Sequence, residues 1–396
     1  MKTQLSVLTA LVTFALSTQV SATEDNGIHN MLANGEVHGM LRYRYENVDQ
    51  SGIAEQAHAS TLLTRINYTT ATLKGVSALL EFDNVTEIGN DNYNSTVNGH
   101  TDHPVVADPK GTEVNQASLQ FKNKELHVVA GRQRINLDDQ RFVGGVAWRQ
   151  NEQTFDGYRV VYKPSESLKF DYSYVFNVNR IFGEDSNKSD LHGKLHFANA
   201  AYQVNKQFNV SVFAYLYDFD AALASSTQTM GVRATGQLSD SLSYTLSYAT
   251  QQDYADNPNS FDADYILAEL KGKVSKLGWK VGYELLGSDN NIGFSTPLAT
   301  GHKFQGFADK FLATPGNGLA DLYFGVNGQL ADIKLSATYH FFDSDAHSID
   351  YGQELDLTAA YALSSNCNVL FKYVMYNADD YATDTDKVWL MLTHKF

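Results

Sequence analysis

Hydrophobic and polar residues alternate with a period of two along most of the chain. In the run LSYTLSY at 242–248, every second residue is Leu or Tyr, and the residues between them are Ser and Thr. The run LGWKVGYEL at 277–285 repeats this alternation. A period of two sends successive side chains to opposite faces of an extended strand. The pattern therefore predicts strands that each carry one apolar and one polar face.

The alternation predicts 18 strands, joined by connections that are short and long in strict turn. Every second connection then lies at the same end of the sheet. An even number of strands with short turns at one end, long loops at the other and an apolar outer face is typical of an outer-membrane β-barrel. The longest predicted loops are 86–114, 136–154, 179–193 and 287–318. The predicted strands are 36–46, 60–69, 75–85, 115–122, 125–135, 155–163, 167–178, 194–203, 207–218, 227–237, 241–251, 261–271, 276–286, 319–329, 332–342, 353–363, 367–377 and 387–396.

A transmembrane sheet must close on itself, because hydrocarbon offers no partner to the N–H and C=O groups of an open edge. The alternative is a soluble β-sandwich or β-solenoid with its apolar faces packed inward. That fold needs a second sheet to cover those faces, which strictly alternating hairpins do not supply. The pattern favours an all-β chain with one transmembrane antiparallel barrel over residues 23–396 and no plug domain before it.

The N-terminus has the order of residues expected of an export signal. Lys2 precedes an apolar run from Leu5 to Leu16, and small residues lead up to Ala22. We expect a cleaved signal peptide over residues 1–22. The apolar run is shorter than the ~20 residues that a membrane-spanning helix needs. The sequence thus predicts export to the outer membrane of a Gram-negative bacterium, where lipids and lipopolysaccharide surround the barrel.

The last predicted strand ends with Leu390, Leu392 and Phe396 on one face. This arrangement resembles the terminal signal by which the barrel assembly machinery recognises its clients. We therefore expect these three residues to act as an assembly signal, and the assembly machinery to be a partner.

Composition excludes several other functions. The formal net charge is −15, and no segment has the basic excess that nucleic-acid binding requires. The single Cys367 excludes an intramolecular disulfide. Phosphate-binding loops, nucleophile elbows and zinc-protease motifs do not occur. We expect no enzymatic activity, no cofactor and no metal site. An outer-membrane hydrolase and a structural or adhesive barrel remain the alternative functions.

Charged residues on the polar strand faces are expected to line the lumen, because an arginine facing lipid near the midplane costs ~2–4 kcal/mol. Arg132 and Arg134 are two residues apart, so we expect both in the lumen, with Val129 and Ile135 facing outward. Facing rows of charge would orient polar solutes, or else the charges pair locally and stiffen the wall. The predicted solute path comprises Arg42, Arg44, Arg65, Arg132, Arg134, Arg159, Arg233, Lys122, Lys169, Lys280, Glu81 and Asp83.

Loop 136–154 carries its own charges directly after Arg134. Gly144 and Gly145 allow a tight bend within it. We expect this loop to fold into the barrel and set the aperture, supplying counter-charges to the strand arginines. The alternative is an extracellular loop held by ion pairs within itself. The predicted constriction residues are Asp138, Asp139, Arg141, Trp148, Arg149 and Glu152.

Four stretches of the sequence resemble the alginate export family of outer-membrane barrels. They are LLEFDNVTEIGNDNYNSTVNG at 79–99, DPKGTEVNQASLQF at 108–121, GRQRINLDDQRFVGGVAWRQNEQTFDG at 131–157 and GHKFQGFADKF at 301–311. The resemblance implies an 18-stranded barrel with an arginine-lined conduit for an anionic polysaccharide. It also implies that Arg132 and Arg134 are the family's strand arginines, and that Arg141, Trp148, Arg149 and Gln150 belong to its loop motif.

These observations together predict a passive outer-membrane channel for anionic or polar small solutes, with an anionic polysaccharide or oligosaccharide such as alginate among the candidates. Export and uptake both remain open, because a passive conduit follows whichever gradient exists. The oligomeric state also stays open, because lipid-facing and subunit-facing surfaces of a barrel are both apolar.

Overall fold

Alternation along each strand determines which side chains face the outside. In β12 (Asp262–Val274), exposed and buried residues alternate: Ile266 and Leu270 are exposed, whereas Tyr265 and Leu267 are buried. Ile266 and Leu270 are thus apolar residues on the exposed face, which inverts the arrangement of a soluble sheet. This is the arrangement of a barrel whose outer surface contacts lipid.

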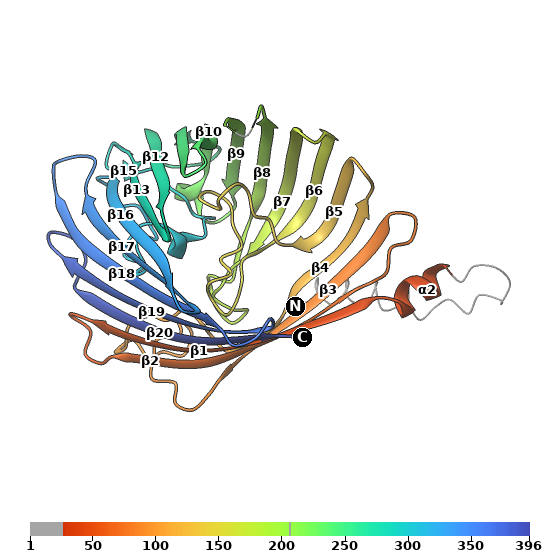
Figure 1. Ribbon diagram of the computed structural model, residues 1–396, viewed down its shortest axis with the longest axis horizontal. Helices are drawn as coiled ribbons and strands as arrows, with labels where there is room; N and C mark the ends of the chain where they lie inside the picture. Colours follow the sequence, from red (N-terminus) through yellow and green to blue (C-terminus); the bar gives the residue numbers. More distant parts are fainter. Residues whose placement is uncertain (1–26, 206) are drawn as a thin grey trace.

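The computed structural model describes residues 27–205 and 207–396, and shows a closed antiparallel barrel of 18 strands (Figure 1). This confirms the predicted fold class and strand number. The predicted signal peptide lies outside the described residues. The strands of the barrel are β1 (Glu36–Gln50), β2 (Ala57–Thr69), β3 (Val76–Glu87), β4 (Gly111–Lys122), β5 (Leu126–Gln133), β6 (Thr154–Ser165), β7 (Leu168–Asn179), β8 (Asp190–Gln203), β9 (Asn209–Phe219), β10 (Thr227–Ser239), β11 (Leu242–Asp253), β12, β13 (Leu277–Leu286), β16 (Leu319–Leu330), β17 (Ile333–Asp343), β18 (Asp350–Ala362), β19 (Cys367–Ala378) and β20 (Thr385–Lys395).

The remaining elements are short. Helix α2 (Gly27–Ala33) precedes β1, and the 3-10 turn η1 (Leu223–Ser225) lies between β9 and β10. The connection from β13 to β16 contains the two-residue strands β14 (Ser288–Asp289) and β15 (Ile292–Gly293) and the turn η2 (Gly301–Lys303). Among the described residues, no helix is long and apolar enough to cross a membrane.

Pairing of the first strand with the last closes the barrel. Met40 of β1 lies opposite Lys395 of β20, and the register continues to Gln50 and Thr385. The backbone of Phe396 extends the ladder by exchanging hydrogen bonds with Gly39, at 2.7 and 3.0 Å. Closure leaves no sheet edge open to lipid.

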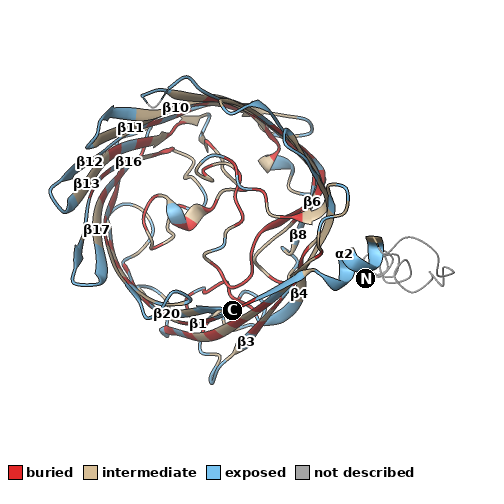
Figure 2. Cartoon of the chain, turned by 45° about the vertical axis from the view of Figure 1, so that its right-hand side comes forward, coloured by how far each residue is buried: buried red, intermediate tan, exposed pale blue. Residues whose placement is uncertain are grey.

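Two long loops, 134–153 between β5 and β6 and 287–318 between β13 and β16, account for much of the interior. Figure 2 looks into the barrel and shows loop segments, many of them buried, inside the ring of strands. Val143 of the first loop and Leu298 of the second are fully buried in an apolar core. Its wall residues come from β6 to β9, β11 to β13 and β16 to β20. The hydrophobic core therefore lies within the lumen, between the two loops and much of the surrounding wall.

Candidate functional site

The two interior loops are joined to each other along their backbones. Gly144 donates its N–H to the carbonyl of Leu298 at 2.9 Å, and Thr300 donates to Gln140 at 3.1 Å. The side-chain amide of Gln153 donates to the carbonyls of both Gly144 and Leu298, at 2.8 and 3.1 Å. We call loops 134–153 and 287–318 together the two-loop unit. Sequence reasoning expected only the first of these loops inside the barrel.

Aromatic packing anchors the two-loop unit to one side of the wall. The ring of Phe142 lies 5.1 Å from Phe213 of β9 and 5.2 Å from Tyr265 of β12, measured between centroids. Phe294 of the second loop packs 5.9 Å from Phe142. Such contacts bury apolar surface from both loops and both strands. This side of the lumen is therefore filled rather than open.

A buried ion pair fastens the same side. Arg141 donates from Nε to Oε1 of Glu284 on β13 at 2.6 Å, and both side chains are almost completely buried. Glu284 also accepts a hydrogen bond from the Tyr265 hydroxyl at 2.7 Å. The remaining guanidinium nitrogens of Arg141 donate to Thr296 and Gln305, so the arginine connects both loops to the wall.

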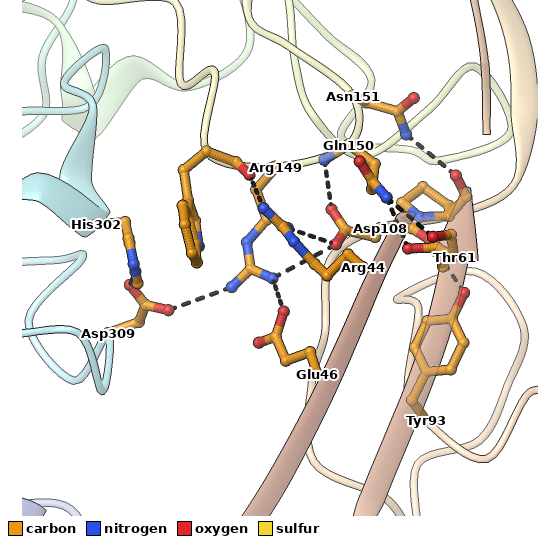
Figure 3. A network of polar contacts seen from close by, with 12 residues as sticks. Arg44, Glu46, Thr61, Tyr93, Asp108, Arg149, Gln150, Asn151, His302 and Asp309 are labelled. Carbon is orange, nitrogen blue, oxygen red and sulfur yellow. Dashed lines mark hydrogen bonds and ion pairs between the residues drawn. The ribbon is translucent and has the colours of Figure 1, made fainter. Parts of the chain in front are cut away.

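Ionic contacts reach the opposite wall through Arg149 (Figure 3). Its guanidinium lies 3.0 Å from Glu46 of β1 and 3.2 Å from Asp309 of the second loop. Asp108, from the loop between β3 and β4, pairs with Arg44 at 2.9 Å and accepts the Gln150 N–H at 2.7 Å. Burial raises the pKa of Asp108, but Arg44 and Arg149 outweigh it, so the net pKa lies below the ordinary value.

Arg42 binds the loop without a carboxylate. Its Nε donates to the side-chain oxygen of Gln150 and one Nη to the carbonyl of Ala147, both at 2.9 Å, and the other Nη donates to the carbonyl of Arg149. A guanidinium carries five donors in a rigid fork, which suits it to hold several acceptors at once. Arg42 thereby fixes the backbone of loop 134–153 against β1.

Glu152 connects a second cluster of charges. It accepts hydrogen bonds from Arg65 of β2 at 2.7 Å and from Arg134. Arg65 also pairs bidentately with Asp83 of β3, and Arg134 pairs with Glu81. Burial raises the pKa of Glu152, but Arg134 and Arg65 together hold it below its ordinary value. Glu152 thus supplies the counter-charge that the sequence led us to expect from this loop.

A group of aromatic and basic side chains surrounds Trp148. Its indole stacks on the His302 imidazole, with centroids 4.2 Å and planes 6° apart. The guanidinium carbon of Arg44 lies 4.4 Å from the indole centroid, and Nζ of Lys372 on β19 lies 4.2 Å from it. His302 donates from Nδ1 to Asp309 and accepts from Nζ of Lys372 through Nε2, each at 2.7 Å.

The first turn of loop 134–153 contacts the wall of β8 to β10. Asp139 pairs with Arg233 at 2.9 Å, whereas Asp138 accepts from the amide of Asn199 at 2.7 Å. A cavity of about 550 Å³ extends from these residues toward the short turns. Its lining includes Asp138, Lys163, Lys169, Ser211 and Arg233.

Four of the predicted luminal cations lie away from the two-loop unit. Arg159 pairs with Asp171 of β7 at 2.7 Å, and Lys169 lies 3.7 Å from the same carboxylate. Nζ of Lys280 lies 5.0 Å from the ring centroid of Tyr323. Lys122, at the end of β4, is exposed. Local pairing, rather than a free row of charge, is the arrangement around Arg159.

The expectation that Arg132 and Arg134 share a face is wrong. Arg132 lies opposite Ala117, which is two residues from the outward, 52 % exposed Leu119, and it pairs with Asp156 at 2.8 Å. β5 ends at Gln133, so strand alternation no longer governs Arg134. For the same reason Ile135, expected to face outward, is completely buried in the luminal core. Val129, also expected to face outward, is within β5, lies opposite Gln120 and Arg159, and is buried.

Sequence reasoning missed four charged or polar partners in the lumen. Glu46 lies two residues after Arg44 on β1 and therefore faces the same side of the strand as Arg42 and Arg44, so alternation alone could have identified it. Asp108, His302 and Asp309 belong to irregular loops, where no periodicity reports the direction of a side chain. The three residues of the expected assembly signal, Leu390, Leu392 and Phe396, are exposed.

The sequence matches the model of the alginate export family over residues 36–314. No curated protein matches it. Among solved structures, *Acinetobacter baumannii* OccAB4 superposes with a TM-score of 0.72 at 15 % identity, covering 93 % of this chain and 99 % of that one. *Pseudomonas aeruginosa* OccK9 (OpdG) gives 0.73 at 12 %, with coverage of 93 % and 99 %.

*Pseudomonas aeruginosa* OpdK, solved with vanillate, is similar to the same extent. Its TM-score is 0.72 at 13 % identity, and the match covers 92 % of this chain and 99 % of OpdK. OpdK is an outer-membrane protein of that organism. At these identities the likeness establishes the barrel fold, and the family match is a separate result. The chain belongs to the alginate export family and has the fold of outer-membrane porins.

Proposed function

We propose that this chain is a passive outer-membrane channel for anionic or polar small solutes, and that sugar acids of the kind that make up alginate are among them. Diffusion through the lumen needs no cofactor. The two-loop unit sets the aperture, the buried arginines of β1, β2 and loop 134–153 contribute positive charge around it, and Arg134, with a side chain that is 27 % exposed, is the arginine that a solute meets there. A guanidinium suits this role because its fork of donors matches a carboxylate bidentately.

The observation that carries this proposal is the set of arginines that cross the lumen together with the loop. Arg44 and Arg65 project from the wall, and Arg141 and Arg149 project from loop 134–153 to opposite sides of the barrel. The family match to alginate export and the binding of vanillate by the structurally similar OpdK both support an anionic solute. Alginate is a polymer of sugar carboxylates, and vanillate is a small aromatic carboxylate.

Liposome swelling tests this function. Vesicles that contain the purified chain are diluted into isotonic glucuronate, glucose or a long dextran. We expect rapid swelling in glucuronate, slower swelling in glucose and none in dextran, because the charged constriction admits small solutes and prefers anions. Protein-free vesicles are the control. Vesicles that do not swell in any small solute would contradict the channel function.

A further inference from the structure

The wall formed by β1, β20 and β19 carries a buried lysine, Lys372, whose neighbouring carboxylates Asp309, Glu354 and Asp356 act on it only from beyond direct contact. Lys372 is only 5 % exposed, and no carboxylate of the described residues lies within ion-pair distance of its Nζ. Its hydrogen-bond partner is Nε2 of His302, at 2.7 Å. An ammonium has three N–H donors, and His302 accepts from only one of them, so two donors of Lys372 remain without a hydrogen-bond acceptor in the described part of the chain. A buried cation in this condition is costly and favours the approach of an anion.

Three side chains near Lys372 carry N–H donors without an acceptor. Nε of Arg44 and the indole Nε1 atoms of Trp148 and Trp389 are all buried without an acceptor. The two indoles contact each other edge to face, with centroids 5.7 Å apart. Nζ of Lys372 lies 4.2 Å from the Trp148 centroid and 5.4 Å from that of Trp389. Four side chains that can only donate hydrogen bonds therefore adjoin one another.

The carboxylates of this region are directed elsewhere. Glu46 and Glu354 bind Arg149 and the Ala308 N–H through one oxygen each, their other oxygens are buried without a hydrogen bond, and neither forms an ion pair with Lys372. Asp309 accepts from His302, Arg149 and Lys387, and it therefore has little remaining capacity for Lys372.

Loop 287–318 supplies the groups that cover Lys372. The ring of Phe307 lies 3.0 Å from Nζ, and the His302 ring stacks on Phe307 as well as on Trp148. His302 Nε2 thus stands where an oxygen of a bound anion would accept from the ammonium. Displacement of His302 and Phe307 would open the donors to the lumen.

We propose that Arg44, Lys372, Trp148 and Trp389 form a binding site for one carboxylate of the transported solute, and that His302 occupies it when no solute is present. The proposal rests on the proposed channel function and names the residues that select the solute. The carboxylate accepts hydrogen bonds from Lys372 and from the unpaired N–H groups. The His302 and Phe307 side chains of loop 287–318 move aside to admit it.

Glucuronate and glucose are the matched probes, because they differ mainly by one carboxylate. The intrinsic fluorescence of the detergent-solubilised chain reports on the site, since two of the three tryptophans lie in it. We expect glucuronate to change the emission in a saturable way and glucose to leave it unchanged. Lys372→Met should weaken the glucuronate response about tenfold, the loss expected for a charge-assisted hydrogen bond. His302→Ala should strengthen it, because a competing acceptor is removed.

Lys280→Met is the matched control, since Lys280 is also a luminal lysine against an aromatic ring but has no unpaired indole N–H beside it. Equal glucuronate responses in the Lys372→Met and Lys280→Met variants would overturn the site. A weaker response in His302→Ala would do the same, and this variant is informative even where Lys372→Met fails to fold. Absence of swelling by the wild-type chain in glucuronate contradicts the channel function instead, so the two failures are distinguishable.

Discussion

At the scale of single residues, most arginines of the lumen are held by acceptors from more than one segment. Arg149 bridges β1 and loop 287–318, and Arg65 binds both Asp83 of β3 and Glu152 of loop 134–153. Removal of one partner from such a buried pair costs more than an exposed ion pair would, because a charge is left without compensation. Substitutions in the lumen therefore alter loop position as well as charge.

Arg134 and Arg132 form a matched pair for testing selectivity. Arg134→Gln removes a positive charge from between Glu81 and Glu152, so the lumen becomes more negative and the reversal potential in a salt gradient should shift toward cations. Arg132→Gln removes a charge from the opposite face and should leave the reversal potential unchanged. Planar-bilayer recordings of both variants measure the shift. Equal shifts would show that both side chains lie in the conduction path.

His302 should make the contact between loop 287–318 and the wall sensitive to acid. Burial and the neighbouring Lys372 ammonium hold the pKa of His302 well below its ordinary value of 6.5. The neutral imidazole accepts from Lys372, and a second proton would place two cations 2.7 Å apart. The stabilisation is therefore complete above pH 6.5 and is lost as the pH falls through the lowered pKa.

Channel recordings from pH 7.5 down to about pH 4 test this expectation over the range in which a depressed histidine titrates. Conductance fluctuations should increase with acidity in the wild-type chain. His302→Gln, which keeps an acceptor but does not titrate, should flatten that dependence. An identical pH profile in the variant would assign the titration to another group, such as one of the acidic residues of the loops.

At the scale of elements, contacts all around the lumen hold the two-loop unit in place. Aromatic packing and the Arg141–Glu284 pair hold it to β9, β12 and β13, and ion pairs hold it to β1 and β2. Phe311 and Trp148 add aromatic contacts to β17, β18, β19 and β20. Alternation predicted the strands and the loop lengths. It could not predict that loop 287–318 enters the barrel, because that depends on contacts such as Val143 with Leu298 between segments far apart in sequence.

Arg141→Ala should weaken the attachment of the two-loop unit to β9, β12 and β13. Glu284 would then be a buried carboxylate that has lost its cation, a change that costs about 3–5 kcal/mol in comparable sites. We expect larger and noisier single-channel steps, because the constriction is less well held. Arg159→Ala is the control, since Arg159 pairs with Asp171 within the wall. Noise that rises equally in both variants would argue against a specific role of the loop anchor.

At the scale of the whole molecule, closure and orientation follow from alternation, turn lengths and the terminal strand. The predicted arginine pair was misplaced in two ways. Val129 and Arg132 lie on the opposite faces of β5 to those expected, and Arg134 follows the end of β5 at Gln133, where the alternation stops. The central cluster around Trp148 could not be derived in the same way, because its members come from β1, β19, β20 and two loops. Strand faces are readable from local sequence, whereas contacts among interior loops are properties of the closed barrel.

Deletion of Phe396 tests the terminal strand as part of the whole barrel. Its backbone adds two hydrogen bonds to the closing ladder with Gly39, and its side chain is exposed. We expect the deletion to lower the amount of folded, heat-modifiable protein in the outer membrane, while His394→Ala has a smaller effect. Unchanged amounts of folded barrel after the deletion would exclude an assembly role for this residue.

The most direct test of the central claim is single-channel recording of the purified chain in a planar bilayer under a potassium chloride gradient. We expect discrete conductance steps with a reversal potential that indicates chloride selectivity. In the Arg134→Gln variant the reversal potential should shift toward potassium. A wild-type chain that inserts as a folded barrel and yet gives no conductance steps would contradict the account.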